Sequence, residues 1–171
     1  MKGVTLVEGD ALDADAVARA VSGQEAVIST LGPRGASPRD LCSRAARILA
    51  GAMMTRGVRR LVMVTGAMVG HPPARLGLFY RLMLAFPPRA LRELLEDRRF
   101  SERIIRQSDL EWTLVHPPRL AHGPARGRFK AGEDLRLSSF ARIPRADLAR
   151  FLVGEAEQGV WKRRAVAVAE P

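Results

Sequence analysis

Few residues of this chain could transfer a proton at neutral pH, because such a group needs a pKa near neutrality. The only tyrosine is Tyr80, and the residue four positions later is Leu84, so a tyrosine assisted by a lysine at that spacing is not available. Arg98 stands four residues before Glu102. An arginine is a poor proton donor because its pKa stays above about 12. We therefore expect Arg98 to attract an anionic group; the alternative is an exposed helix residue paired with Glu102.

Metal and disulfide chemistry have little support in the sequence. The three histidines, His71, His116 and His122, lack the close spacing of metal ligands, so we expect no metal site. Cys42 is the only cysteine, which excludes a disulfide within the chain. His116 ends an apolar run, where a hydrogen-bonded histidine at a strand end is more common than a ligand-binding one.

The length and composition favour one globular domain. The chain has 171 residues, of which 47% are hydrophobic and 27% are charged. No apolar run reaches the roughly 20 residues that cross a bilayer, and no signal-peptide core follows Met1. We therefore expect one domain over residues 1–171, no membrane span and a cytoplasmic location.

The net charge of +10 raises the question of a nucleic-acid partner. Only three of the 28 basic residues are lysines, the arginines are scattered, and aromatic residues make up 5% of the chain. A stacking platform for single strands needs more aromatic faces. We therefore expect solvated arginines on helix surfaces and no nucleic-acid partner.

Short apolar runs alternate with longer segments of helical spacing, which is typical of an α/β fold. We expect strands at residues 4–7, 26–31, 60–65, 112–116 and 165–168, and helices at residues 13–21, 98–108 and 146–154. A further helix should begin with Ser37 as its N-cap and Pro38 in its first turn, and Gly57 should end it. Strands that are apolar along their whole length indicate a Rossmann-like parallel sheet with helices on both faces.

The segment of residues 71–97 is too apolar for a loop. Its apolar part, residues 76–86, is expected to form a buried helix or a contact between two copies of the chain; the alternative is a mobile cover over a ligand cleft.

Ligands of such sheets gather at the carboxyl ends of the strands. The expected strands end in four short motifs, Gly9-Asp10-Ala11-Leu12, Leu31-Gly32-Pro33-Arg34, Thr65-Gly66-Ala67 and His116-Pro117-Pro118-Arg119-Leu120. In this order they resemble the atypical short-chain dehydrogenases of the NmrA-like and biliverdin-IXβ/flavin-reductase type, a Rossmann-fold NAD(P)H-binding family. The segments at residues 57–62, 102–113 and 145–149 add to the resemblance.

The resemblance implies a cofactor, NADP or NAD, and a place for each motif around it. Asp10 and Ala11 would lie beside the adenine, and Leu31, Gly32 and Arg34 would border the adenosine and the phosphates. The loop of Thr65, Gly66 and Ala67 would lie near the nicotinamide ribose. The nicotinamide would be lined by the segment that comprises His116, Pro117, Pro118, Arg119 and Leu120.

Two departures from the family pattern weaken this picture. The pattern begins with a strand, a glycine-rich phosphate loop, a helix and a second strand, and this sequence starts after them, so the first β-α-β unit is absent. We expect weak dinucleotide binding and direct pairing of residues 4–7 with residues 26–31. Arg98 also occupies the position at which the family places lysine or histidine.

These departures favour chemistry without a protein acid. The expected function is hydride transfer from the nicotinamide to a small-molecule acceptor of the flavin or quinone type, for which stacking and orientation suffice. Arg98 is the candidate catalytic residue. The alternative is a protein without catalysis, either an NmrA-like sensor of NAD(P) or a degenerate, shortened relative. The sequence does not choose between these, nor between NADH and NADPH.

Overall fold

The helices and strands alternate along most of the chain. The computed structural model describes residues 4–70 and 85–171. These form, in order, α1 (Ala14–Val21), β1 (Ala26–Ser29), α2 (Leu41–Thr55), β2 (Arg60–Val64), α3 (Ala67–Gly70), α5 (Arg89–Arg106), β3 (Glu111–His116), β4 (Arg119–Ala121), β5 (Lys130–Gly132), β6 (Arg142–Pro144), α6 (Arg145–Gln158) and β7 (Arg164–Ala169).

The main sheet has the strand order β1-β2-β3-β7-β5. Its first four strands are parallel, and β5 runs antiparallel to β7. A separate ribbon pairs β4 with β6. The expected α/β fold with a parallel sheet is confirmed, whereas β4, β5, β6 and the short α3 were not predicted from the sequence.

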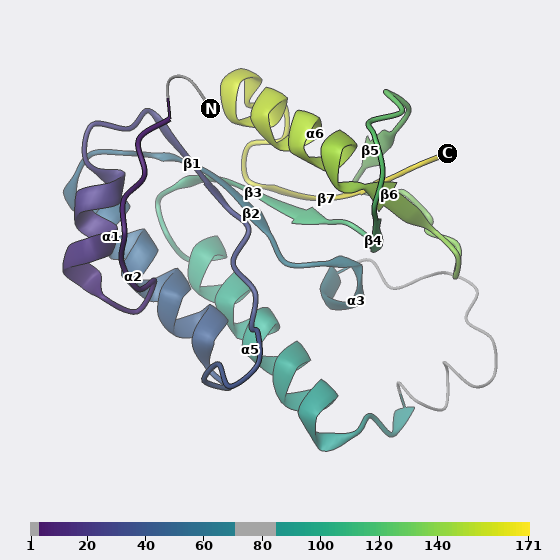
Figure 1. Cartoon of the computed structure of the whole chain (residues 1–171), viewed down its shortest axis with the longest axis horizontal. Coiled ribbons are helices and arrows are strands. Elements are labelled where there is room, and N and C mark those ends of the chain that lie inside the picture. The colour runs from purple at the N-terminus through teal and green to yellow at the C-terminus, as the bar shows by residue number, and fades with distance from the viewer. Residues whose placement is uncertain (1–3, 71–84) are drawn as a thin grey trace.

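Helices cover both faces of the sheet, with α1, α2 and α5 on one side and α6 on the other (Figure 1). Successive residues of a strand point to opposite faces. In β2, Leu61 and Met63 pack in the core under α2 and α5, and Val62 packs in the core under α6. A strand buried on both faces therefore needs a continuous apolar run, which is why these strands were visible in the sequence.

Residues 4–7 do not form the expected strand. They run as an exposed segment, with Leu6 92% exposed. Within the described ranges β1 pairs with β2 alone, so the expected pairing of residues 4–7 with residues 26–31 is wrong. β-propensity makes a strand only where a neighbouring strand completes the hydrogen bonds, and residues 4–7 have no such neighbour among the residues described.

The helix α2 begins at Leu41 after Asp40, so the expected N-cap at Ser37 is also wrong. The Ser37 hydroxyl instead donates to the Arg34 carbonyl and accepts from the Arg34 amide, which closes a turn before the helix. α5 and α6 are longer than expected because their polar outer residues continue the helices that the apolar spacing revealed only in part.

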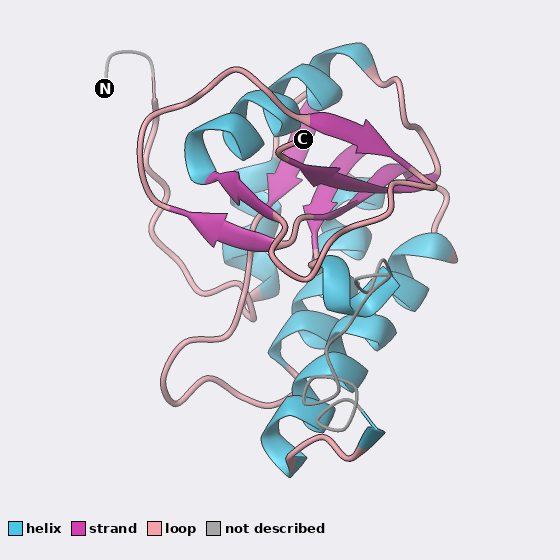
Figure 2. Ribbon diagram, turned by 90° about the vertical axis from the view of Figure 1, so that its right-hand side faces the viewer, coloured by secondary structure: helices cyan, strands magenta, loops and turns pink. Residues whose placement is uncertain are grey.

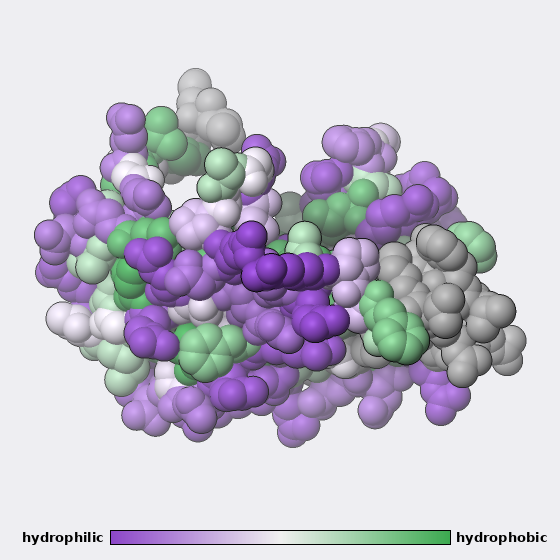
Figure 3. All heavy atoms as spheres, turned by 90° about the horizontal axis from the view of Figure 1, so that it is seen from below, coloured by the Kyte–Doolittle hydropathy of each residue, from purple (hydrophilic) through white to green (hydrophobic). Residues whose placement is uncertain are grey.

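Most of the apolar segment at residues 76–86 lies outside the described residues, so the expectations for it remain expectations. No helix in the described ranges is long and apolar enough to cross a membrane, and no cluster of candidate metal ligands occurs there. Seen from below in Figure 3, the surface is mostly hydrophilic. The arginines of α5 that are exposed to solvent contribute to this character: Arg89, Arg92, Arg99, Arg103 and Arg106.

Candidate functional site

The loops that follow β1, β2 and β3 lie at one edge of the sheet, on the side that faces the viewer in Figure 2. Three backbone hydrogen bonds join residues 65–67, which follow β2, to β3 and the residue after it; the longest, over 3.5 Å, runs from the Gly66 amide to the Val115 carbonyl. The Thr65 amide donates to the Val115 carbonyl over 3.0 Å, and the Ala67 amide donates to the Pro117 carbonyl over 2.9 Å. The structure therefore brings Thr65, Gly66 and Ala67 next to the end of β3 and Pro117.

Arg98 reaches this edge from α5. Its Nη1 donates to the Thr65 carbonyl over 2.8 Å. A Cβ at Gly32 would lie 3.6 Å from Arg98 Nη2, and one at Gly66 would lie 3.3 Å from Nη1. Arg98 thus lies across the ends of β1 and β2, where both loops present glycine to it.

Arg98 and Glu102 do not form the ion pair that their spacing allowed. In the part of the chain that the structure describes, Arg98 is paired with no carboxylate. Glu102 is instead buried, and Arg106 Nη2 lies 3.2 Å from its Oε2. The interpretation of Arg98 as half of an exposed pair with Glu102 is therefore wrong, because α5 turns Glu102 toward the sheet.

Glu102 connects the loops after β2 and β3. Thr65 Oγ1 donates to Glu102 Oε1 over 2.5 Å, and His116 Nε2 lies 2.6 Å from the same oxygen. Burial alone would raise the pKa of Glu102. The hydrogen bond and charge of His116, with hydrogen bonds from Thr65 and Arg106, outweigh burial and hold this pKa below its ordinary value. Glu102 is therefore a carboxylate that fixes two loops at once.

His116 is fully buried beneath α3. A Cβ at Gly70 would lie 2.1 Å from His116 Cε1, a distance that no side chain could occupy without moving the ring. Position 70 thus requires glycine for a close approach rather than for a turn. The expected hydrogen-bonded histidine at a strand end is confirmed, and its partner is Glu102.

A hollow of about 730 Å³ opens beside β1. Four of the predicted cofactor residues line it: Ala11, Leu31, Gly32 and Arg34. The rest of its wall is mainly apolar, from β1 and from the α1 and α2 residues that face β1, including Val27 and Ala46. Its size and its mostly apolar lining are those of sites that hold small molecules.

Four predicted residues lie outside these groups. Asp10 closes the turn before α1, where its Oδ1 accepts from the Leu12 amide over 2.9 Å. Arg119 and Leu120 are exposed residues of β4, which pairs directly with β6. Pro118 lies between them and the buried Pro117. The structure thus spreads the expected nicotinamide segment over a buried half and an exposed half.

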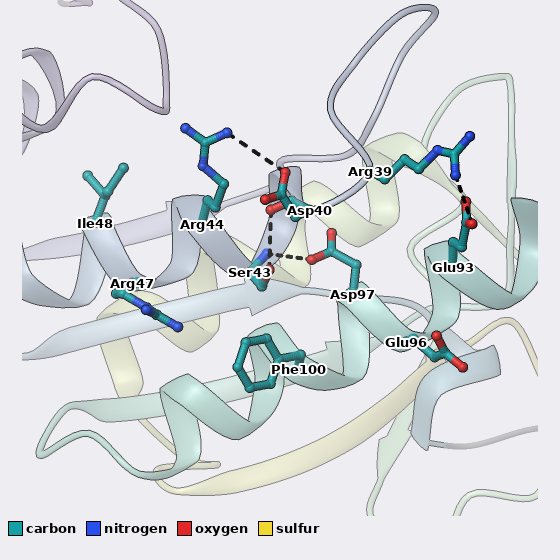
Figure 4. Close-up of a pocket in the computed structure, with 10 residues that line it drawn as sticks. All are labelled: Arg39, Asp40, Ser43, Arg44, Arg47, Ile48, Glu93, Glu96, Asp97 and Phe100. Carbon is teal, nitrogen blue, oxygen red and sulfur yellow. Dashed lines mark hydrogen bonds and ion pairs between the residues drawn. The ribbon is translucent and has the colours of Figure 1, made fainter.

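Asp97 holds the start of α2, next to the hollow beside β1, and the sequence did not reveal this role. From α5, its carboxylate accepts from the amides of Cys42 and Ser43 over 2.8 and 3.0 Å, as Figure 4 shows for Ser43. It therefore caps α2 in place of a local side chain. Burial and the neighbouring Asp97 raise the pKa of the Cys42 thiol. No local pattern could have indicated this bond, because its partners are more than 50 residues apart.

Comparison with known proteins identifies the family behind this arrangement. Residues 1–158 match the model of a family described as NAD(P)H-binding, which is most of the 171 residues. The chain belongs to this NAD(P)H-binding family. The NAD(P)H-binding family and the Rossmann-like fold that the strand-end motifs predicted are thereby confirmed.

Solved structures share the fold of this NAD(P)H-binding family member. The anaerobillin reductase ChuY from Escherichia coli O157:H7 matches with a TM-score of 0.77 and 24% identity, over 99% of this chain and 76% of ChuY. A short-chain dehydrogenase/reductase from Veillonella parvula DSM 2008 in complex with NADP matches with a TM-score of 0.78 and 16% identity, over 100% and 74% of the two chains. The oxidoreductase ylbE from Lactococcus lactis has a TM-score of 0.74 and 16% identity, over 99% and 73%.

Proposed function

We propose that this protein is an NAD(P)H-dependent reductase whose acceptor is a small molecule of the flavin or quinone type. When bound, the reduced nicotinamide supplies a hydride, and water supplies the proton that the reduced acceptor takes up. The chain's own contribution is to orient the two reactants and to hold charge near them. A cytoplasmic location belongs to the same proposal.

The residues at the strand ends could hold the adenosine and the nicotinamide end of a dinucleotide, but not its pyrophosphate. The hollow beside β1 would hold the adenosine, with Ala11 and Leu31 against it and Arg34 directed to a phosphate. The loop after β2 and the buried Pro117 would hold the nicotinamide end. The pyrophosphate has no glycine-rich loop in this sequence, so we expect weak binding of NADP or NAD.

Arg98 carries the proposal. It is a partly buried cation at the ends of β1 and β2, and among the described residues it has a carbonyl partner but no carboxylate. A cation in this state attracts an anion, either a cofactor phosphate or the charge that develops on a reduced acceptor. Arg98 is therefore proposed as the catalytic residue, acting through its charge and not as an acid.

The decisive experiment is NADPH and NADH oxidation, followed by absorbance, with FMN and with menadione as acceptors. We expect turnover with at least one pair and a loss of about tenfold in kcat/KM for Arg98→Gln, the size of one charge-assisted contact. Arg99→Gln, which changes an exposed arginine one position along α5, is the matched control and should keep the wild-type rate.

Two results would overturn the proposal. Dinucleotide binding without turnover would favour the sensor alternative, which the absence of a tyrosine–lysine pair also suits. Equal rates for the Arg98 and Arg99 variants would remove Arg98 from the reaction. Tight dinucleotide binding by calorimetry would instead contradict the expected weakness of the phosphate site.

A further inference from the structure

The helix α5 divides its charged residues between its two faces. It contains six arginines and four acidic residues. Two of the acids, Asp97 and Glu102, are buried, whereas Glu96 is exposed and Glu93 is partly exposed. Five of the arginines are exposed to solvent, at positions 89, 92, 99, 103 and 106. The outer face of α5 therefore carries five cations and two acids.

The exposed arginines form one row along the helix. Successive members are three, seven, four and three residues apart, and these spacings return a helix of about 3.6 residues per turn to the same side. From Arg89 to Arg106 the row extends over about 26 Å, at about 1.5 Å per residue. Within the described ranges, Arg92 and Arg99 form no ion pair. Cations aligned in this way act together on a partner that carries many negative charges.

The neighbouring helix adds to the positive charge of this surface. Glu93 lies 2.8 Å from Arg89 and also 2.8 Å from Arg39, so one acid is shared between two cations. The sequence of α2 contains no acidic residue. Its Arg47 lines the same hollow as Phe100 of α5, as Figure 4 shows. The positive surface therefore extends from α5 onto the side of α2.

Two phenylalanines are exposed along the same helix. Phe86, three residues before α5, is 78% exposed, and Phe100 within α5 is 42% exposed. The Arg103 guanidinium lies over the ring of Phe100, 5.9 Å from its centroid. Arginines combined with exposed phenylalanines are typical of surfaces that lie in the headgroup region of a membrane, where the cations meet phosphates and the rings meet acyl chains.

Nucleic acid fits this surface less well. The major groove of DNA, about 12 Å wide, admits a helix that projects from its protein. The helix α5 does not project, because α2 packs along it (Figure 1). Phe86 and Phe100 are 14 residues apart in the sequence, so they do not form a platform on which successive bases could stack.

We propose that the outer face of α5, together with Phe86, binds the surface of a bilayer that contains anionic lipids. The arginines contact lipid phosphates, and the two phenylalanines enter the headgroup region. The binding is peripheral, since no helix in the described ranges could cross a membrane. The proposal is independent of the proposed reductase function, because this face includes none of the predicted site residues.

The test measures flotation of the purified chain with two kinds of vesicle, phosphatidylcholine alone and equal parts of phosphatidylcholine and phosphatidylglycerol. We expect binding to the anionic vesicles only, and release as salt rises from about 0.1 M to about 1 M, because the Debye length falls from about 10 Å to about 3 Å. The double variant Arg92→Gln, Arg99→Gln should lower the partition coefficient about 25-fold, or about fivefold for each arginine. Phe86→Ser should lower it about fivefold, because the ring no longer leaves water.

The matched control is the double variant Arg145→Gln, Arg150→Gln. It removes the same charge from exposed positions of α6, on the other side of the sheet (Figure 1). The partition coefficient of this control should stay within about twofold of wild type, because salt screens charges on the far side of the protein. Far-ultraviolet circular dichroism of all variants checks that they are folded.

Three results would overturn the inference. Equal binding to neutral and anionic vesicles would remove the role of charge, and equal losses in the two double variants would remove the role of this face. Duplex DNA that displaces the protein from anionic vesicles at an equal concentration of phosphate would assign the face to nucleic acid instead.

Discussion

β1 and β3 flank the same strand, β2, and both run parallel to it. β3 has a second neighbour in β7, and its residues 112–116 are all buried. β1 pairs only with β2 in the part of the chain that is described, and Ile28 at its centre is 37% exposed. The two strands therefore differ in burial and in the number of neighbouring strands that the described residues give them.

The loops that follow the two strands differ in the same way. At β3, His116 and Thr65 share the buried carboxylate of Glu102, so their positions are fixed by hydrogen bonds within the core. At β1, Leu31 and Arg34 line an open hollow. The nicotinamide half of the proposed site is thus organised in advance, and the adenosine half gains less support from the fold.

The largest expected effect on stability comes from the buried ion pair next to β3, on the well-packed side of the sheet. Arg60 of β2 and Glu155 of α6 are 2.6 Å apart and buried, and Glu155 also accepts from Thr113. Burial lowers the pKa of Arg60, and Glu155 offsets part of that effect. Arg60→Met leaves the carboxylate unpaired, and we expect the free energy of unfolding in urea to fall by about 3–5 kcal/mol.

The control for this pair is the exposed bridge between Arg164 and Glu133 at the start of β7. Arg164→Met should cost about 0–1 kcal/mol, because water screens the charges. Equal losses of stability in the two variants would show that the ion pair beside β3 is no better shielded from water than the exposed one.

A direct comparison of the two strands uses Ile28 and Val62, which are register partners across β1 and β2. Val62 is fully buried. Val62→Ala should reduce the free energy of unfolding by about 2–3 kcal/mol, as for deletion of buried methyl groups, and Ile28→Ala should cost less than about 1 kcal/mol. Urea denaturation measures both. A larger loss at Ile28 would mean that the β1 edge is covered in solution.

The cap of α2 gives a smaller effect. Asp97→Asn removes the charge that meets the first amides of the helix, and we expect a loss of about 1–2 kcal/mol in the free energy of unfolding. Asp40→Asn is the matched control, since Asp40 stands at the N-cap but its side chain makes no cap hydrogen bond. A loss at Asp40 as large as at Asp97 would contradict the assignment of the cap.

The smallest effect concerns pH. The folded pKa of Glu102 lies below its ordinary value of 4.5, so its charge contributes stability that is complete above that pH and is lost as the pH falls through the folded pKa. Wild type should be more stable than Glu102→Gln at neutral pH, and the two should converge in acid. Urea titrations from neutral pH to about pH 3 would show this.

The exposed Glu157→Gln provides the control for the acid titration and should follow the wild type at every pH. A difference between wild type and Glu102→Gln that stays constant with pH would show that the carboxylate does not stabilise the two loops through its charge.

The elements found from the sequence are those whose signal is local. The strands expected at residues 60–65 and 112–116 were visible because strands buried on both faces are mostly apolar. The segment at residues 4–7 has the same composition, yet a strand also needs a partner, and composition does not encode one. Ser37 and Asp40 stand before the same helix, and local rules could not foresee that Asp97 would cap it.

In the candidate site too, local signals could be found from the sequence and long-range contacts could not. Gly32, Thr65 and Ala67 were placed at one edge because parallel strands all end there. The bonds that organise this edge join Glu102 to Thr65 and His116, which come from three different elements, so only the folded chain reveals them. The cofactor and catalytic roles of these residues remain predictions that the kinetic experiment above would test.

In the part of the chain that the structure describes, β1 has a neighbouring strand on one side only, and this edge affects how the protein should be handled. Unpaired amides and carbonyls along a strand form a template on which other chains can aggregate, and many proteins suppress this with a charged residue at the edge. Here Ile28 occupies the centre of that strand, so we expect the overall charge of +10 to provide the protection by keeping molecules apart. Salt shortens the Debye length from about 10 Å at 0.1 M to about 3 Å at 1 M. Concentrated stocks should therefore stay clear longest in dilute buffer, and Ile28→Lys should remove that dependence.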